Sequence, residues 1–142
     1  MSMLDLKAGF HNVPFEEKSS YDSTFITHRG KFRWLRMPMG LTQAPAHFQY
    51  VVETVLKGAP GDRPLPVVVY LDDIAVFGDD ADQVLLDTEE AIRRLTTAGF
   101  IINMKKSQLV DDSAKVLGHK WSAGGFWEPV VTRLESLLGK TE

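Results

Sequence analysis

Two adjacent aspartates interrupt an apolar run near the middle of the chain, and this feature restricts the fold more than any other. Residues 67–71 (Val-Val-Val-Tyr-Leu) are typical of a buried β-strand, and residues 74–77 (Ile-Ala-Val-Phe) are typical of its partner. Because only Asp72 and Asp73 separate the two runs, we predict a tight hairpin with both aspartates at its tip. A divalent cation would relieve the repulsion between them. Alternatively, both are ordinary solvated turn residues.

Helical periodicity marks two segments. After Pro45, apolar residues recur at helical spacing until Gly58, namely Phe48, Val52, Val55 and Leu56. The second helix begins with the cap pair Asp80 and Gln83 and ends at Gly99. Its predicted inward stripe consists of Val84, Thr88, Ala91, Ile92 and Leu95. A Pro- and Gly-rich loop, expected to be exposed and mobile, occupies residues 58–66 between the two patterns.

The remaining patterns predict short strands. Residues 24–36 alternate around Arg29-Gly30 and predict a β-hairpin with aromatic rings on one face and cations on the other. Further short strands are expected near residues 101–102, 116–117 and 126–127, and a last helix over residues 130–138. Hairpins instead of regular βαβ alternation predict an α+β fold, with helices on one face of the sheet.

Size and composition restrict the class of protein. A chain of 142 residues with 44% hydrophobic and 25% charged side chains fits one globular domain. The absence of Cys excludes a disulfide scaffold and thiolate chemistry, so we expect an intracellular, not a secreted, protein. We find no membrane-spanning run and no signal-peptide pattern. The net charge of −3 gives no indication of nucleic-acid binding.

Asp5 adds a third carboxylate to the argument. It lies in the apolar stretch Met3-Leu4-Asp5-Leu6, where an unpaired charge is unfavourable. If this stretch is a strand beside the predicted hairpin, Asp5 converges with Asp72 and Asp73 at one end of a sheet. Such a cluster is what two-metal phosphoryl transfer requires, with one ion at the attacking oxygen and the other at the leaving group.

Five short motifs, in order along the chain, resemble those of reverse transcriptases. Residues 4–11 (Leu-Asp-Leu-Lys-Ala-Gly-Phe-His) are similar to motif A, and residues 37–49, beginning Met-Pro-Met-Gly-Leu-Thr-Gln-Ala-Pro, are similar to motif B. Residues 70–73 (Tyr-Leu-Asp-Asp) are similar to motif C, residues 103–107 to motif D and residues 116–119 to motif E. The residues of these motifs resemble those of gypsy-type LTR retrotransposon enzymes.

This resemblance implies a fold and an activity. The fold would be a reverse-transcriptase palm, an antiparallel sheet with two long helices on one face plus a short C-terminal helix. Residues 1–124 would form the palm, and residues 125–142 would begin the thumb or connection. The activity would be that of an RNA-directed DNA polymerase, which transfers a nucleotide from a dNTP to a primer 3′-hydroxyl.

The resemblance also assigns chemical roles. Asp5, Asp72 and Asp73 would be the catalytic carboxylates that bind Mg²⁺, or Mn²⁺ in its place, with Asp73 the weakest candidate for a direct ligand. Lys106 matches the motif D lysine, a candidate proton donor to the pyrophosphate leaving group. The alternative for Lys106 is a solvated surface lysine.

Further positions would contact the substrates. The motif A segment expected along the incoming triphosphate consists of Leu6, Lys7, Ala8, Gly9 and Phe10. Phe10 matches the steric gate against the ribose 2′-hydroxyl, and the alternative is an ordinary core aromatic. The floor of the nucleotide and template pocket would include Gly40, Gln43 and Pro45. The primer grip would comprise Leu117, Gly118 and His119.

Two classes of function remain open from the sequence. In the first, the chain is the palm of a polymerase that acts on an RNA or DNA template–primer, with fingers, thumb and RNase H regions elsewhere in a parent polyprotein. In the second, it is a truncated or domesticated palm without catalytic activity that binds protein or nucleic acid as a homodimer or other homo-oligomer. A third alternative, a palm of the diguanylate cyclase kind, does not account for motifs B and E.

Overall fold

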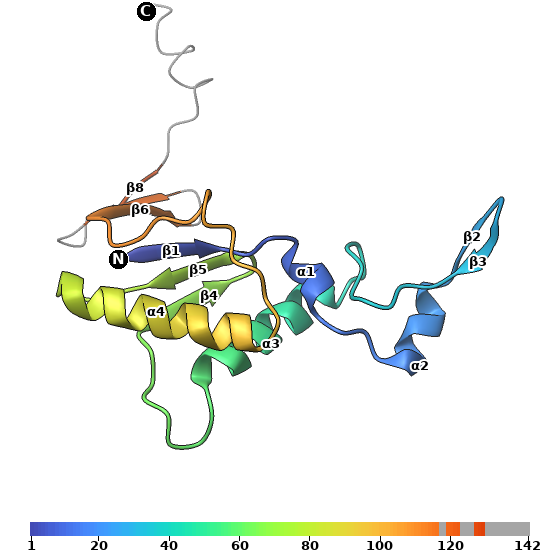
Figure 1. Ribbon diagram of the computed structural model, residues 1–142. Coiled ribbons are helices and arrows are strands. Elements are labelled where there is room, and N and C mark those ends of the chain that lie inside the picture. The colour runs from blue at the N-terminus through green and yellow to red at the C-terminus, as the bar shows by residue number, and fades with distance from the viewer. Residues whose placement is uncertain (117–118, 123–126, 130–142) are drawn as a thin grey trace, which may run out of the picture.

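The computed structural model describes residues 1–116, 119–122 and 127–129 (Figure 1). The helices in this part are α1 (Gly9–Asn12), α2 (Glu17–Ser20), the 3₁₀ helix η1 (Tyr21–Ser23), α3 (Ala44–Lys57) and α4 (Ala81–Thr97). The strands are β1 (Ser2–Asp5), β2 (Phe25–Thr27), β3 (Gly30–Phe32), β4 (Val67–Tyr70), β5 (Asp73–Val76), β6 (Ser113–Val116), β7 (His119–Ser122) and β8 (Trp127–Pro129). The mixed composition confirms the predicted α+β class.

The central sheet has the antiparallel order β1-β5-β4. The predicted hairpin is present, but its turn is displaced by one residue. Tyr70 pairs with Asp73, so the two-residue turn is Leu71-Asp72, and Asp73 already belongs to β5. Leu71 takes the left-handed conformation (φ 52°) that the first position of such a tight turn requires.

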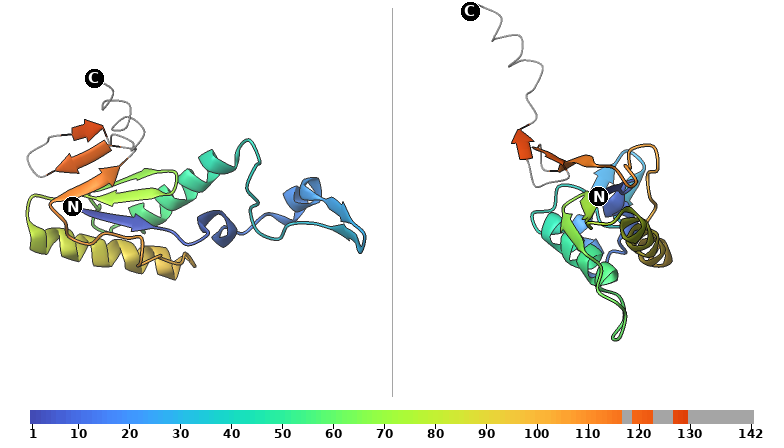
Figure 2. Two further views of the ribbon diagram at one scale, coloured as in Figure 1. Left: turned by 90° about the horizontal axis from the view of Figure 1, so that it is seen from above. Right: turned by 90° about the vertical axis from the view of Figure 1, so that its left-hand side faces the viewer.

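The two long helices cover one face of this sheet, as predicted (Figure 2). Pro45 lies in the first turn of α3, and the Asp80 side chain accepts a hydrogen bond from the Gln83 amide at 3.0 Å to cap α4. The inward face of each helix joins the sheet in one core. The buried members of this core include Leu4, Ile74 and Val76 from the sheet, Phe48, Val52 and Leu56 from α3, and Ala91 and Leu95 from α4.

The opposite face of the sheet is only partly covered. The antiparallel sheet of β6, β7 and β8 lies over it, and Ala114 of this second sheet packs with Met3 and Ala75 (Figure 2). On the edge strand β4, Val68 and Tyr70 remain 55% and 49% exposed. The prediction of a buried strand is therefore wrong for β4, because no layer in the described part of the chain covers this part of its outer face.

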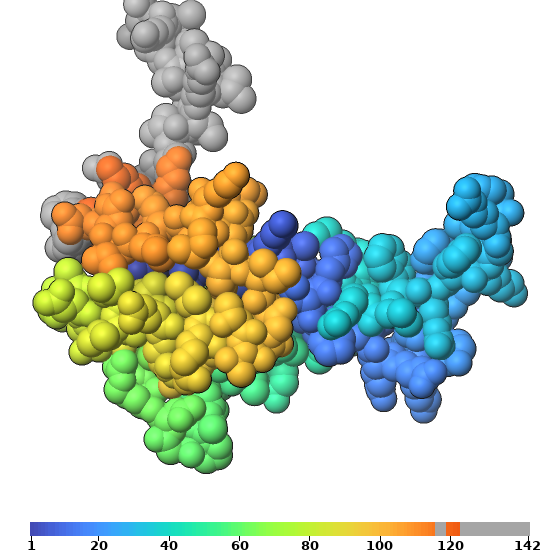
Figure 3. All heavy atoms as spheres, viewed as in Figure 1, coloured from blue at the N-terminus to red at the C-terminus, as the bar shows by residue number. Residues whose placement is uncertain are grey.

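Residues 13–43 form an arm that extends away from the body of helices and sheets (Figure 3). The arm carries α2, η1 and the predicted hairpin, here β2 and β3 with its turn at His28-Arg29. The Phe25 ring lies 6.0 Å from the rings of both Phe32 and Trp34, which confirms the predicted aromatic face of the hairpin. All three rings are more than 40% exposed.

The loop at residues 58–66 is exposed, as predicted, but it is anchored to α4. The buried Arg94 donates hydrogen bonds to the carbonyl oxygens of Leu56, at 2.6 Å, and Arg63, at 3.0 Å. Arg63 in turn forms an ion pair with the buried Asp87. These contacts fix the end of α3 and the middle of the loop, at Arg63, against α4, which is unlike the mobile loop expected from its Pro and Gly content.

The C-terminal predictions have mixed outcomes. The strand expected near residues 101–102 is absent, because Ile102 makes only an isolated bridge to Leu6. The second expected strand begins earlier, as β6, and β8 corresponds to the third. The helix expected over 130–138 and the boundary after residue 124 lie outside the described residues. No helix in the described part of the chain has both the length and the apolar composition needed to cross a membrane.

Candidate functional site

The strand pairing brings the three predicted carboxylates to one end of the central sheet. Asp5 ends β1 and lies directly opposite Asp73, the first residue of β5, in the antiparallel register. Asp72 precedes Asp73 in the turn. The convergence that we inferred from the apolar context of Asp5 therefore exists, and it results from the antiparallel pairing of β1 with β5.

Side-chain alternation places these groups on the sheet face that points away from the helices. Leu4 and Ile74, the neighbours of Asp5 and Asp73, are buried against α3 and α4. Asp5 and Asp73 must then point to the other face. Asp5 is half-buried, whereas Asp72 and Asp73 are exposed. The carboxylates are thus open to a ligand approaching this face.

The three carboxylates influence one another, as the raised pKa of Asp72 indicates. Partial burial raises the pKa of the Asp72 carboxyl above its usual range, and the negative charges of Asp5 and Asp73 raise it further. The ionised state of Asp72 is therefore disfavoured in the absence of a cation. A bound divalent ion would reverse this effect by compensating the negative charges.

The donor set fits a divalent cation that takes part of its ligands from water or substrate. Within residues 1–116, 119–122 and 127–129, no group of three acidic or histidine side chains is arranged to hold one ion in common. Asp5, Asp72 and Asp73 are therefore not arranged as a preformed three-ligand site, and their role as metal ligands stays a prediction. Mg²⁺ commonly takes only one or two carboxylates and completes its shell with water and substrate phosphates.

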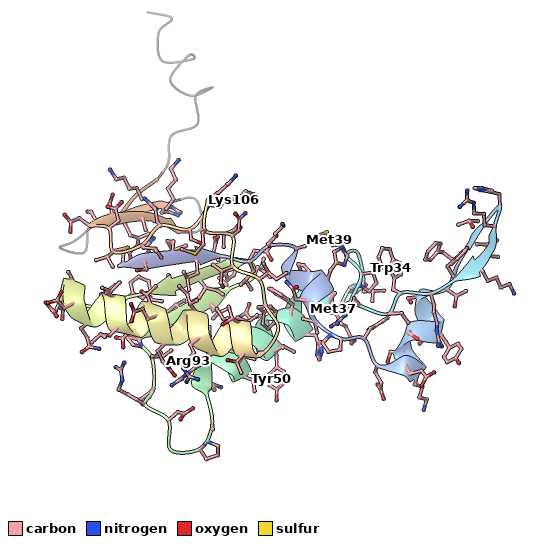
Figure 4. The ribbon with its side chains drawn as sticks, viewed as in Figure 1. Trp34, Met37, Met39, Tyr50, Arg93 and Lys106 are labelled. Carbon is pink, nitrogen blue, oxygen red and sulfur yellow. The ribbon has the colours of Figure 1, made fainter. Side chains whose placement is uncertain are left out.

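Lys106 lies on the loop that passes along the outer edge of β1 (Figure 4). The backbone of this loop bonds to Asp5, since the Asn103 amide donates to the Asp5 carbonyl at 2.8 Å. Lys106 itself is exposed, and its amide donates to the Asn103 carbonyl at 3.0 Å. The predicted proton donor therefore belongs to the same end of the sheet as the carboxylates.

Phe10 is in part a core aromatic, which is one of the two roles that the sequence left open, and its role as a steric gate stays a prediction. Its ring stacks on that of Phe48 at 4.6 Å, and Phe48 also meets Phe100 edge to face. Phe10 is nevertheless only half-buried. It is a core aromatic on one side and retains exposed surface for a substrate contact.

The other motif A residues differ in exposure. Leu6 is buried in the core, whereas Lys7 and Ala8 are exposed. Gly9 is required for packing, because a Cβ atom there would lie 2.7 Å from Cζ of Phe48. We predicted Gly9 for close approach of a triphosphate, and the structure gives it this second, steric reason.

The motif B residues lie where the arm meets α3. Gly40 is exposed in the left-handed region (φ 94°), and Pro45 lies in the first turn of α3. Gln43 lines a pocket of about 370 Å³ together with Met37 and His47. Gly40 and Pro45 lie beside this pocket in the sequence but are not part of its lining.

Only one residue of the predicted primer grip can be located. His119 begins β7, whose partner β6 carries Ala114 against the central sheet. Leu117 and Gly118 lie outside the described residues. The role of all three remains a prediction.

Sequence reasoning missed Ser107, which contacts the backbone of Asp5. The Ser107 hydroxyl accepts a hydrogen bond from the Asp5 amide at 3.1 Å and donates to the Asn103 carbonyl at 3.0 Å. No local signal reveals this contact, because it depends on how the loop pairs with β1 one hundred residues earlier in the chain.

Comparison with known proteins agrees with these observations. Residues 1–121 match the family model described as reverse transcriptase (RNA-dependent DNA polymerase). The retrovirus-related Pol polyprotein from transposon opus of Drosophila melanogaster is 34% identical over 123 residues, which is 87% of this chain and 12% of the relative. The transposon Tf2-3 polyprotein of Schizosaccharomyces pombe is 32% identical, over 87% of this chain and 9% of its own length.

Solved structures agree in fold. The foamy viral protease-reverse transcriptase in complex with an RNA/DNA hybrid superposes with a TM-score of 0.80 and 27% identity, over 99% of this chain and 18% of that chain. The same viral protein in complex with dsDNA gives a TM-score of 0.78, over 99% of this chain and 28% of that chain. The palm-like α+β fold is thereby confirmed.

The chain spans about a tenth of the length of the curated relatives that it matches. Those relatives are retrotransposon polyproteins, with which the predicted gypsy-type resemblance is consistent. The family match covers most of the chain and includes Asp5, Asp72 and Asp73. The chain belongs to the reverse transcriptase (RNA-dependent DNA polymerase) family.

Proposed function

We propose that this chain is the catalytic palm of an RNA-directed DNA polymerase that extends a primer on an RNA or DNA template. The observation that carries the proposal is the pairing of β1 with β5, which sets Asp5 opposite Asp73 beside Asp72 on an accessible face. The structural relatives captured with an RNA/DNA hybrid and with dsDNA support nucleic acid as the ligand of that face.

Asp5 and Asp72 are the best candidates to hold Mg²⁺ or Mn²⁺, and Asp73 adds negative charge beside them. When bound, the cations would lower the pKa of the primer hydroxyl and neutralise charge on the phosphates. The primer 3′-oxygen would then attack the α-phosphorus of the dNTP, and the bond to the pyrophosphate would break. Positioning and charge compensation supply most of the rate in such reactions.

The remaining site residues have defined tasks in this proposal. Lys106 would donate a proton to the departing pyrophosphate, since its loop is bonded to the strand that carries Asp5. Phe10, fixed from behind by Phe48, would exclude a 2′-hydroxyl from the sugar of the incoming nucleotide. Backbone groups along residues 6–9 would face the triphosphate, and the region of His119 would hold the primer end.

The rest of the machinery would come from elsewhere in a parent polyprotein. The curated relatives are several times longer than this chain, which is consistent with fingers, thumb and RNase H regions outside it. Reverse transcription uses intracellular templates and dNTPs, so the proposed protein would act inside the cell.

Primer extension tests this proposal. The chain is incubated with a labelled primer on an RNA template, dNTPs and either Mg²⁺ or Mn²⁺, and Asp72→Asn is compared with the exposed control Asp112→Asn. We expect extension by the wild type and by Asp112→Asn, and none by Asp72→Asn. Equal extension by all three would contradict the proposal.

A second candidate function is a binding module that has lost catalysis. The exposed aromatic face of the arm, with Phe25, Phe32 and Trp34, is the observation that favours it, because surfaces of this kind commonly contact another macromolecule. Light scattering over a range of protein concentrations, combined with the extension assay, separates the candidates. A concentration-dependent dimer without any extension would favour the binding module.

A further inference from the structure

The loop that carries Lys106 is paired to the outer edge of β1 at two places. Before Asp5, the amides of Met3 and Gln108 each donate to the carbonyl of the other residue, at 2.7 and 2.8 Å. After Asp5, Leu6 bridges Ile102, and the Lys7 amide donates to the Ile101 carbonyl at 2.8 Å. The loop therefore behaves as a fourth, interrupted strand beside β1.

The interruption lies opposite Asp5. The Met3–Gln108 and Leu6–Ile102 bridges are three residues apart in β1 but six residues apart in the loop. The extra residues form a bulge around Met104, Lys105 and Lys106, all of which are exposed. A bulge of this kind displaces the loop backbone from β1, so no main-chain carbonyl reaches the Asp5 amide.

Ser107 supplies the hydrogen-bond acceptor that is missing from the ladder at this point. Its hydroxyl takes the place of the missing carbonyl and accepts the hydrogen bond of the Asp5 amide at 3.1 Å. The same hydroxyl donates to the Asn103 carbonyl at 3.0 Å, and the Asn103 amide donates to the Asp5 carbonyl at 2.8 Å. These three bonds close a ring through Asp5, Ser107 and Asn103, across the base of the bulge.

We propose that Ser107 is a positioning residue that couples the Lys106 bulge to the carboxylate of Asp5. The inference rests on the proposed polymerase function and deepens it. One side-chain hydroxyl fixes the backbone from which the Asp5 carboxylate projects, and it also closes the bulge that presents Lys106. A shift of either element would then displace the metal ligand and the proton donor together.

Ser107 itself touches no substrate in this scheme, so its effect must be measured through Asp5. Amide hydrogen exchange at Asp5 reports the Ser107 bond directly, and the Mn²⁺ dissociation constant reports the position of the carboxylate. The variant Ser107→Ala removes the acceptor. Ser107→Cys keeps the connectivity of the side chain but has a larger sulfur atom, which is only a weak acceptor, and Ser107→Thr retains the hydroxyl.

Ser113 provides the matched control, because its side chain is half-buried and belongs to β6, away from the bulge. For Ser107→Ala and Ser107→Cys we expect the Asp5 amide to exchange about tenfold faster, the size expected for loss of one hydrogen bond. We also expect Mn²⁺ binding to weaken by about tenfold. Ser107→Thr and Ser113→Ala should resemble the wild type in both measurements.

The possible failures are distinguishable. Unchanged exchange at Asp5 in both Ser107→Ala and Ser107→Cys would overturn the proposed bond. Faster exchange with unchanged Mn²⁺ affinity would overturn the positioning role, because the bond would then be only structural. A wild-type chain that binds Mn²⁺ but extends no primer would count against the polymerase proposal, while the exchange rates and Mn²⁺ affinities of the variants would still decide the role of Ser107.

Discussion

Asp5 and Asp73 stand directly opposite each other in the antiparallel ladder of β1 and β5, with both side chains on the face away from the helices. Like charges directly across a ladder destabilise a sheet. Asp72 adds a third negative charge in the adjoining turn, and its pKa is raised as a result of burial and of these two neighbours. These three negative charges therefore destabilise the protein when no cation compensates them.

This arrangement predicts that Asp72→Asn stabilises the protein when divalent cations are absent. The substitution removes a charge that the fold disfavours, so we expect the melting temperature at pH 7 to rise by about 2 °C in EDTA. Excess Mn²⁺ should raise the melting temperature of the wild type more than that of the variant, because ligands stabilise only the state that binds them. Asp112→Asn should show neither effect.

The raised pKa of Asp72 also predicts that the stability difference between the wild type and Asp72→Asn depends on pH. A raised pKa means that the folded state holds the Asp72 proton more tightly than the unfolded state does, so stability falls as pH rises from the usual value of 3.8 through the raised value. The stability difference between Asp72→Asn and the wild type should therefore be largest at neutral pH. It should vanish below about pH 3.8, as measured by urea unfolding in EDTA at several pH values.

In both proteins, the lowered pKa of Glu90 makes stability depend on pH in the opposite direction. Hydrogen bonds from Arg93 and Arg94 lower its pKa to about 2, so its contribution is present above its usual value of 4.5 and is lost as pH falls towards 2. Because wild type and Asp72→Asn share this effect, it cancels in the comparison. An Asp72→Asn difference that grew on acidification would contradict the assignment.

Arg94 should be a major contributor to stability. It is 7% exposed and donates to the carbonyls of Leu56 and Arg63 and to Glu90. Replacing it with Met removes the donor to the carbonyls of Leu56 and Arg63, while Glu90 keeps its bonds from Arg93, and we expect a loss of about 2–4 kcal/mol in the free energy of unfolding. The adjacent Arg93 is largely exposed, so Arg93→Met is the control and should change stability by less than about 1 kcal/mol. Equal effects in denaturant titrations would contradict the anchoring role of Arg94.

Gly9 and Phe48 should be energetically coupled. A methyl group at position 9 would overlap the Phe48 ring, so we expect Gly9→Ala to cost about 1–3 kcal/mol of stability. Phe48→Leu shortens the side chain and should relieve the overlap, although it loses the stacking on Phe10. The double variant should therefore lose less than the two single variants combined. Strict additivity in the same titrations would show that the two positions do not touch.

Phe10 should control which sugar enters the site. Phe10→Val removes the ring that would face the 2′-hydroxyl, and we expect the preference for dNTP over rNTP in primer extension to fall on the order of 100-fold. Phe10→Tyr keeps the ring and should retain the preference. An unchanged preference in Phe10→Val would leave Phe10 as a core residue only, consistent with its stacking on Phe48.

The elements with local signals are those that the sequence predicts well. The cap pair Asp80 and Gln83 and the apolar stripe of α4 are determined within a few turns of one helix, and both are observed. The hairpin of β4 and β5 has an equally local signal. By contrast, α1 and α2 contain four residues each, which is too few to show helical periodicity.

In the candidate site, too, the features with a recognisable signal in the sequence were predictable, and those that depend on the register of long-range pairing were not. The proximity of Asp72 and Asp73 follows from the hairpin, and that of Asp5 follows from one pairing inferred from its apolar context. The role of Ser107 and the absence of a strand at residues 101–102 both depend on a register shift between β1 and a loop one hundred residues later. Pairing over such a separation leaves no periodic pattern in the loop itself.

Binding of Mn²⁺ to the isolated chain tests the central claim most directly, because it needs neither primer nor template. Electron paramagnetic resonance titrations would compare the wild type with Asp5→Asn, Asp72→Asn and the control Asp112→Asn, with Mg²⁺ as competitor. We predict binding that Mg²⁺ displaces, that either site variant weakens at least about tenfold, and that the control leaves unchanged. Equal Mn²⁺ affinity in all four proteins would contradict a cation site at Asp5 and Asp72.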